Sequence, residues 1–205
     1  MSEVDVLLNV SDVLCGSYTN GPGKRVVIWV QGCTINCKGC FNKEKQPHIA
    51  KYLVNPVKFA KDVASICYKT NCEGVTLTGG EPFQQVKALY KFTSVIKEKG
   101  LNIACFSGYS AAKLLNSIDK NIHDLLSNLD VLIAGPFNIN NDYPNRTWYD
   151  DPDKEVVFLT EAYDASALFP EENVEYIIEN EHLHITGFVD LEDKEIARKV
   201  AKSRE

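Results

Sequence analysis

The sequence has no apolar run close to the roughly 20 residues needed to cross a bilayer, and it has no internal repeat or low-complexity stretch. Its first residues include acidic groups and no basic n-region, which argues against a secretion signal and favours a cytoplasmic protein. Its 22 basic and 28 acidic residues give a net charge of −6, and no local basic patch offsets this charge. We therefore expect neither a membrane nor a nucleic acid among the partners.

The composition is that of a folded protein of ordinary domain size. The 205 residues are 44% hydrophobic and 24% charged, which is enough apolar material for a core. Apolar runs predict strands at 25–30, 74–78, 101–106, 130–133 and 155–160, and helical spacing predicts helices at 55–69, 82–99 and 110–117. Such alternation is typical of an α/β fold with parallel strands and right-handed crossovers.

The chain changes character after Phe137. Residues 138–154 are polar and contain many turn formers, so they are expected to form a loop. Residues 173–187 are expected to form a hairpin, and 190–203 a charged helix. We assign residues 1–160 to a core domain and 161–205 to a C-terminal extension packed on that core, with no separate second domain.

Polar and glycine-rich residues follow three predicted strands at their carboxyl ends. They are Gly32-Cys33, Gly79-Gly80-Glu81 and Ser107-Gly108. Because α/β folds place their active sites at this edge of the sheet, we expect the three segments to converge on one site.

The seven cysteines are an odd number, which does not indicate a disulfide framework in a chain with no predicted secretion signal. Cys33, Cys37 and Cys40 form a CX3CX2C motif within eight residues, whereas Cys67 and Cys105 are expected to be buried thiols. Three thiolates can hold three corners of an iron–sulfur cluster and leave one iron open to a ligand. A zinc loop with its fourth ligand elsewhere is the alternative interpretation.

A second motif, Thr78-Gly79-Gly80-Glu81-Pro82, follows the next predicted strand. Its glycines permit close approach of a ligand, and its carboxylate can accept hydrogen bonds from a cationic amine. By itself the motif could be only a turn. Together with an open iron, it suits a ligand that carries an amino group and a carboxylate, such as the methionine end of S-adenosylmethionine.

Five motifs in chain order carry a resemblance to a known family. They are Gly21-Pro-Gly-Lys-Arg25, Gln31-Gly-Cys33 with Cys37-Lys-Gly-Cys40-Phe-Asn42, Thr76-Leu-Thr-Gly-Gly-Glu-Pro82, Phe106-Ser-Gly-Tyr109 and Asp130-Val-Leu-Ile-Ala-Gly-Pro-Phe137. Over about residues 15–160 the chain resembles radical S-adenosylmethionine enzymes of the anaerobic ribonucleotide-reductase activating type. The resemblance implies a partial, open parallel (β/α) barrel.

The resemblance also implies the site residues. Cys33, Cys37 and Cys40 would ligate a [4Fe–4S] cluster whose fourth iron binds S-adenosylmethionine. The other contacts implied are Gly39 and Phe41 along the adenine, Gly79, Gly80 and Glu81 at the methionyl amine, and Ser107 and Gly108 at the ribose or carboxylate.

The activity implied is that of an oxidoreductase which cleaves S-adenosylmethionine to a 5′-deoxyadenosyl radical and installs a glycyl radical on an anaerobic ribonucleotide reductase. A reduced flavodoxin or ferredoxin would supply the electron, and the stretch Gly21-Pro-Gly-Lys-Arg25 would contact the cofactor or partner. A simple turn into the first strand is the alternative interpretation of this stretch. Ala134 stands where this family often has Asp, and 145–151 replace its RGSxNQR-like stretch. These departures favour two alternatives, a peptide or a small molecule as substrate. A third hypothesis is a non-enzymatic iron–sulfur or zinc protein with structural cysteines.

Overall fold

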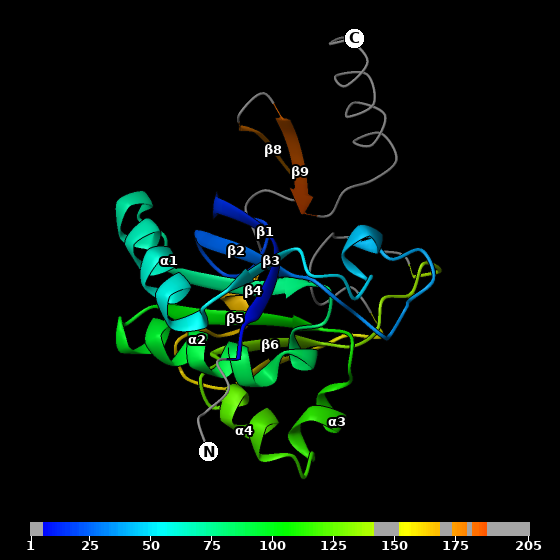
Figure 1. Ribbon diagram of the computed structural model, residues 1–205. Coiled ribbons are helices and arrows are strands. Elements are labelled where there is room, and N and C mark those ends of the chain that lie inside the picture. The colour runs from blue at the N-terminus through cyan, green and yellow to red at the C-terminus, as the bar shows by residue number, and fades with distance from the viewer. Residues whose placement is uncertain (1–5, 142–151, 169–173, 180–181, 188–205) are drawn as a thin grey trace, which may run out of the picture.

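The computed structural model describes residues 6–141, 152–168, 174–179 and 182–187. A seven-stranded sheet with the order β3-β1-β2-β4-β5-β6-β7 forms its centre (Figure 1). The strands are β1 (Leu8–Ser17), β2 (Arg25–Val30), β3 (Tyr52–Val54), β4 (Gly74–Gly79), β5 (Asn102–Ser107), β6 (Val131–Ala134) and β7 (Glu155–Phe158). The neighbours β2, β4, β5 and β6 are parallel, as the sequence predicts.

The helices cover one face of this sheet. They are α1 (Pro56–Thr70), α2 (Val86–Glu98), α3 (Ala111–Leu115) and α4 (Lys120–Leu126), with 3-10 turns η1 (Lys43–Lys45), η2 (Pro82–Gln84) and η3 (Ala165–Leu168). The Asn55 side chain caps α1 by accepting hydrogen bonds from two backbone N–H groups, and left-handed Asn71 ends the helix. The main core joins α1, α2 and α4 to alternate residues of the central strands, including Ile103 and Leu132.

A small second core lies on the opposite face. Ala104, Val131 and Ile133 are buried there and pack against side chains of β5, β7 and Tyr163. No helix in the described part of the chain belongs to this core. The sequence predicts helices over the sheet as a whole, whereas the described helices cover one face.

The free edges of the sheet agree with the open arrangement that was predicted, whereas a barrel is not confirmed. β3 and β7 are the two ends of the strand order, so the sheet of the described residues is open. The sequence analysis missed β1 and β3, which pair antiparallel to each other, and β7 is antiparallel to β6.

The predicted helices are confirmed with two changes. The segment 82–99 divides into η2 and α2, and α4 was not predicted. The expected hairpin is present as β8 (Val174–Glu179) and β9 (His182–Gly187). The predicted helix at 190–203 and most of the 138–154 loop lie outside the described residues. No described helix is long and apolar enough to cross a membrane.

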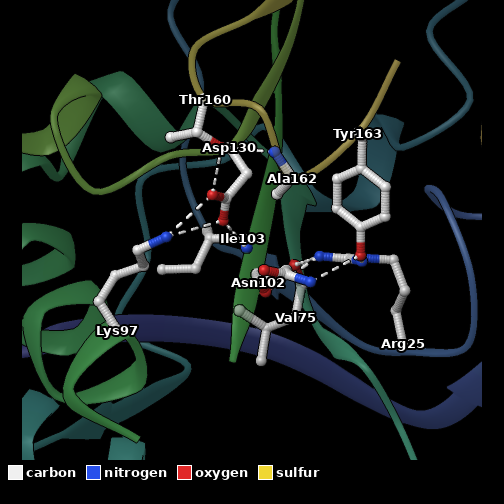
Figure 2. Close-up of polar contacts among 9 residues, drawn as sticks. All are labelled: Arg25, Val75, Lys97, Asn102, Ile103, Asp130, Thr160, Ala162 and Tyr163. Carbon is white, nitrogen blue, oxygen red and sulfur yellow. Dashed lines mark hydrogen bonds and ion pairs between the residues drawn. The ribbon is translucent and has the colours of Figure 1, made fainter. Parts of the chain in front are cut away.

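The side chain of Arg25 is fully buried at the amino ends of the parallel strands. Figure 2 shows its guanidinium beside Val75, Asn102 and Tyr163. It donates hydrogen bonds to the Val75 carbonyl at 2.7 Å, the Asn102 carbonyl at 3.0 Å and the Tyr163 hydroxyl at 3.1 Å. It also donates to Thr76 Oγ1 and the Pro22 carbonyl.

This placement gives the Arg25 side chain a structural role, and contact of the rest of the GPGxR motif with a cofactor or partner stays a prediction. Arg25 begins β2, whereas the cysteines follow the opposite end of that strand. A Cβ on Gly21 would lie 2.7 Å from the Arg25 side chain, so the motif's first glycine makes room for the buried guanidinium. Arg25 therefore fastens three parallel strands together.

A second polar cluster centres on Asp130 at the same edge (Figure 2). Its buried carboxylate pairs with Lys97 Nζ at 2.9 Å and accepts hydrogen bonds from Ile103 N and Thr160 Oγ1. Lys97 lies on α2 and Thr160 follows β7. Asp130 thus ties a helix and an edge strand to the parallel sheet.

Candidate active site

The three clustered cysteines lie on the connection between β2 and β3. Figure 1 shows this blue-to-cyan connection at the end of the sheet toward which β4 and β5 point. Gly32 N donates to the Lys45 carbonyl at 2.8 Å and Cys33 N to the Gln46 carbonyl at 2.9 Å, which fixes the start of the cysteine loop, residues 33–40. Asn36 and Gly39 have φ angles of 55° and 75° and provide its left-handed turns.

The donor set of this loop fits an iron–sulfur cluster better than a closed zinc site. Cys33, Cys37 and Cys40 are all partly exposed free thiols, so they are accessible to metal. In the part of the chain that the structure describes, no three His, Cys, Asp or Glu side chains are already arranged around a metal position. Three thiols without a described fourth ligand suit a cluster that keeps one iron open. Burial raises the pKa of the Cys33 thiol, so its ligation must release a proton.

Gly79 and Gly80 bring the end of β4 against the start of the cysteine loop. A Cβ on Gly80 would lie 2.3 Å from the Gly32 carbonyl oxygen, and one on Gly79 2.7 Å from Val30 N. Gly80 N donates to the Val30 carbonyl, and Glu81 N to the Gly32 carbonyl. Close backbone packing, which the sequence analysis did not foresee, thus requires both glycines. Their contact with a methionyl amine stays a prediction.

The Glu81 carboxylate is buried where the ends of β4 and β5 meet, with 1% of the residue exposed. Its Oε1 accepts from Phe83 N and Ser107 Oγ, and its Oε2 accepts from Gly108 N at 2.8 Å. Burial raises the pKa of Glu81, and these hydrogen bonds oppose the rise. Three of the roughly four acceptor positions of a carboxylate are filled, which leaves one on Oε2. Its contact with a methionyl amine stays a prediction.

Ser107 and Gly108 therefore contact Glu81 directly. The sequence analysis predicts them at the ribose or carboxylate of the cofactor. In this structure the hydroxyl and the amide N–H are both directed to the Glu81 carboxylate. Their contact with the ribose or carboxylate of the cofactor stays a prediction.

The end of the cysteine loop contacts the segment that follows β6. The Phe41 and Phe137 rings meet edge to face with centroids 4.8 Å apart. A Cβ on Gly39 would lie 2.4 Å from Ile139 Cδ1. Phe41 and Ile139 are more than half exposed, so this contact forms an apolar surface beside Cys40. The predicted position of Gly39 and Phe41 along the adenine stays a prediction.

Several contacts of the cysteine loop were absent from the sequence analysis. Gln84 donates hydrogen bonds to Thr34 and to the Tyr109 hydroxyl, and Phe137 and Ile139 pack on the other end of the loop. Phe137 and Tyr109 belong to quoted motifs, so the motifs marked the segments. Their contacts join residues far apart in the chain, and nothing in the local pattern indicates them. Cys67 and Cys105 are buried, as predicted.

A family model described as a 4Fe-4S single cluster domain matches residues 19–157. The chain is 32% identical over 136 residues to the anaerobic ribonucleoside-triphosphate reductase-activating protein of Haemophilus influenzae, an alignment that covers 63% of this chain and 84% of that protein. The protein of the same name from Enterobacteria phage T4 is 30% identical over 139 residues, covering 65% and 83%.

Two further similarities cover a smaller part of this chain. The pyruvate formate-lyase-activating enzyme of Listeria monocytogenes is 34% identical over 104 residues, which is 48% of this chain and 40% of that enzyme. Among solved structures, QueE from Escherichia coli matches 51% of this chain and 53% of its own with 17% identity and a TM-score of 0.37. A likeness of that size carries no argument about the site.

Proposed function

Because the chain belongs to the 4Fe-4S single cluster domain family, we propose that it is a radical S-adenosylmethionine activase that generates a glycyl radical on an anaerobic ribonucleotide reductase. The arrangement that carries the proposal is a loop of three cysteines that follows Gly32, whose carbonyl accepts a backbone hydrogen bond from Glu81 N. The activating proteins of Haemophilus influenzae and phage T4 support the choice of partner.

The residues divide into a cluster-binding group and a cofactor-binding group. Cys33, Cys37 and Cys40 would hold the cluster, and Gly79, Gly80 and Glu81 would receive the methionyl amine. When bound, the reduced cluster supplies the electron that cleaves S-adenosylmethionine and yields the radical that removes hydrogen from the partner. The chain itself would orient the sulfonium, through Glu81 at one end and the cysteine loop at the other.

Three finer assignments belong to the same proposal. The open sheet would be part of a partial (β/α) barrel whose unclosed side admits the partner's glycine segment. Residues 161–205 would extend the core domain 1–160. Contacts of Glu175 with Ser17 and Thr19, and of Tyr163 with Arg25, support this arrangement. A flavodoxin or ferredoxin would be the electron donor.

The test is an anaerobic reaction with the whole chain. The reconstituted protein is reduced in the presence of S-adenosylmethionine and the anaerobic ribonucleotide reductase from the same cell. We expect 5′-deoxyadenosine together with a glycyl-radical doublet in the EPR spectrum of the reductase. Deoxyadenosine without the doublet would favour a peptide or small-molecule substrate. The absence of both would contradict the radical enzyme itself.

A further inference from the structure

Gln84, the last residue of η2, joins three loops at the carboxyl edge of the sheet. Its Oε1 accepts a hydrogen bond from Thr34 N at 3.2 Å, and its Nε2 donates to Thr34 Oγ1 at 2.7 Å. The same Nε2 donates to the Tyr109 hydroxyl at 3.0 Å. One amide side chain thus uses both its donor and its acceptor on a single residue of the cysteine loop.

Thr34 lies directly after Cys33, in the arc between the first two cysteines. The side chain of the neighbouring Ile35 lies close to Gly108, since a Cβ on Gly108 would be 2.7 Å from Ile35 Cδ1. The first half of the cysteine loop therefore rests on η2 and on the segment after β5.

The same two segments hold Glu81. Gly108 N donates to the Glu81 carboxylate at 2.8 Å, and Gln84 N donates to the Glu81 carbonyl at 3.0 Å. Gln84 follows Glu81 by three residues and is only half-buried, so its amide connects the Glu81 backbone to the loop. A shift of Thr34 would also move the first cysteines relative to Glu81.

We propose that Gln84 is a positioning residue that fixes the Cys33–Cys37 arc relative to Glu81 through its paired contact with Thr34. This inference rests on the proposed function, since it assigns the arc to a cluster and Glu81 to the cofactor. Gln84 itself binds neither group. Gln84 reduces the conformational entropy that the loop must lose when it binds the cluster. The cluster is therefore bound more tightly and is lost more slowly.

The test replaces Gln84 with methionine, which has similar length but lacks the amide. After anaerobic reconstitution, two quantities are measured: the rate at which a chelator removes iron, and the EPR spectrum of the reduced cluster with and without S-adenosylmethionine. We expect Gln84→Met to lose iron about tenfold faster, as expected for the loss of these hydrogen bonds, and to show a changed spectral response to the cofactor. Lys87→Met, which changes an exposed side chain of α2, is the matched control and should match the unaltered protein.

Two further variants separate positioning from folding. Gln84→Glu keeps acceptors for Thr34 N and for both hydroxyls, so it should restore slow iron loss. Thr34→Val removes the hydroxyl contact, so Gln84→Met should have a smaller effect in that background. Thermal unfolding of the metal-free proteins measures any general loss of stability.

Wild-type iron loss and an unchanged spectrum in Gln84→Met would overturn the inference, as would a failure of Gln84→Glu to restore retention. A cluster that forms normally without producing a glycyl radical would contradict only the assignment of the partner. An unaltered protein that takes up no iron would contradict both the function and the role of Gln84.

Discussion

The Ser107 hydroxyl donates a 2.9 Å hydrogen bond to Oε1 of Glu81, which joins the end of β5 to the residue that follows the glycines of β4. Ser107 Oγ also accepts a hydrogen bond from Tyr109 N. The position of the Glu81 carboxylate is thus set by the neighbouring strand as well as by its own backbone.

Ser107→Ala should weaken binding of S-adenosylmethionine without removing the cluster. The variant loses a hydrogen bond to a carboxylate, so we expect the dissociation constant to rise about tenfold. Anaerobic titration of the reconstituted protein measures it, and Ser127→Ala, an exposed serine beyond α4, serves as control. Unchanged affinity in Ser107→Ala would show that Glu81 does not need this bond to bind the amine.

The raised pKa of Glu81 has a defined effect on stability. A carboxyl whose pKa is higher in the folded chain contributes stability below its unfolded pKa, and that contribution is lost as pH rises through the folded pKa. The free energy of unfolding of the unaltered metal-free protein, relative to Glu81→Gln, should therefore fall as the pH rises above the ordinary pKa of a glutamate. Urea unfolding in reductant measures it. A difference that is flat or rises with pH contradicts the burial of an ionising carboxylate.

Gly80→Ala should strongly destabilise the metal-free protein. Its Cβ would meet the Gly32 carbonyl oxygen at 2.3 Å, so the end of β4 and the start of the cysteine loop must separate. We expect a loss of about 3 kcal/mol in the free energy of unfolding, measured in urea.

Gly100→Ala is the control that measures backbone strain without a steric clash. Gly100 has a φ of +71° but nothing within 4 Å of its Cβ position. We expect this variant to lose about 1 kcal/mol, the cost of a left-handed alanine alone. Equal losses in the two variants would argue against the close contact at Gly80.

Arg25→Lys should reduce stability but leave the site intact. A lysine cannot reproduce the planar set of hydrogen bonds that Arg25, in β2, makes with β4 and β5, so we expect a loss of about 3 kcal/mol. Urea unfolding measures that loss, and titration with S-adenosylmethionine checks the reconstituted protein. If Arg25→Lys had normal stability but bound S-adenosylmethionine more weakly, the result would instead support a binding role for the GPGxR motif.

Each of Cys33→Ala, Cys37→Ala and Cys40→Ala should lose most bound iron and sulfide, because two thiolates cannot hold the cluster. Cys67→Ala, which removes a thiol from the buried face of α1, should keep its iron. Iron and sulfide assays after anaerobic reconstitution give the comparison. Full iron content in any single variant of the first set would exclude that residue as a ligand.

The central fold was predictable because its signals are local. β2, β4, β5 and β6 are buried apolar runs that end at glycine or polar residues, and Pro56 marks the first turn of α1. β1 was missed because Asn9, Asp12 and Gly16 interrupt its apolar pattern, and β3 because three residues are too few to show one. The direction of β7 depends on the path of the chain after β6, which no local pattern encodes.

The candidate site was predictable as a set of segments but not as a set of contacts. The cysteine motif and the TGGEP motif lie at the same edge because parallel strands end there. The hydrogen-bond partners of Glu81 and Thr34 could not be predicted, because they depend on how side chains from three loops are oriented in the folded chain. The structural role of Arg25 could not be predicted, because the motif gives the residue type and only the folded chain shows that its side chain is buried.

The strand order has a consequence for how the chain assembles during synthesis. After the early unit β1-β2-β3 has formed, β4, β5, β6 and β7 each add beside the strand made just before, or beside β2 in the case of β4. Among the described strands of this sheet, no late strand has to be inserted between two strands already paired. Because chains emerge from the ribosome amino end first, the cysteines are exposed early, before the ends of β4 and β5 that support their loop have been synthesised.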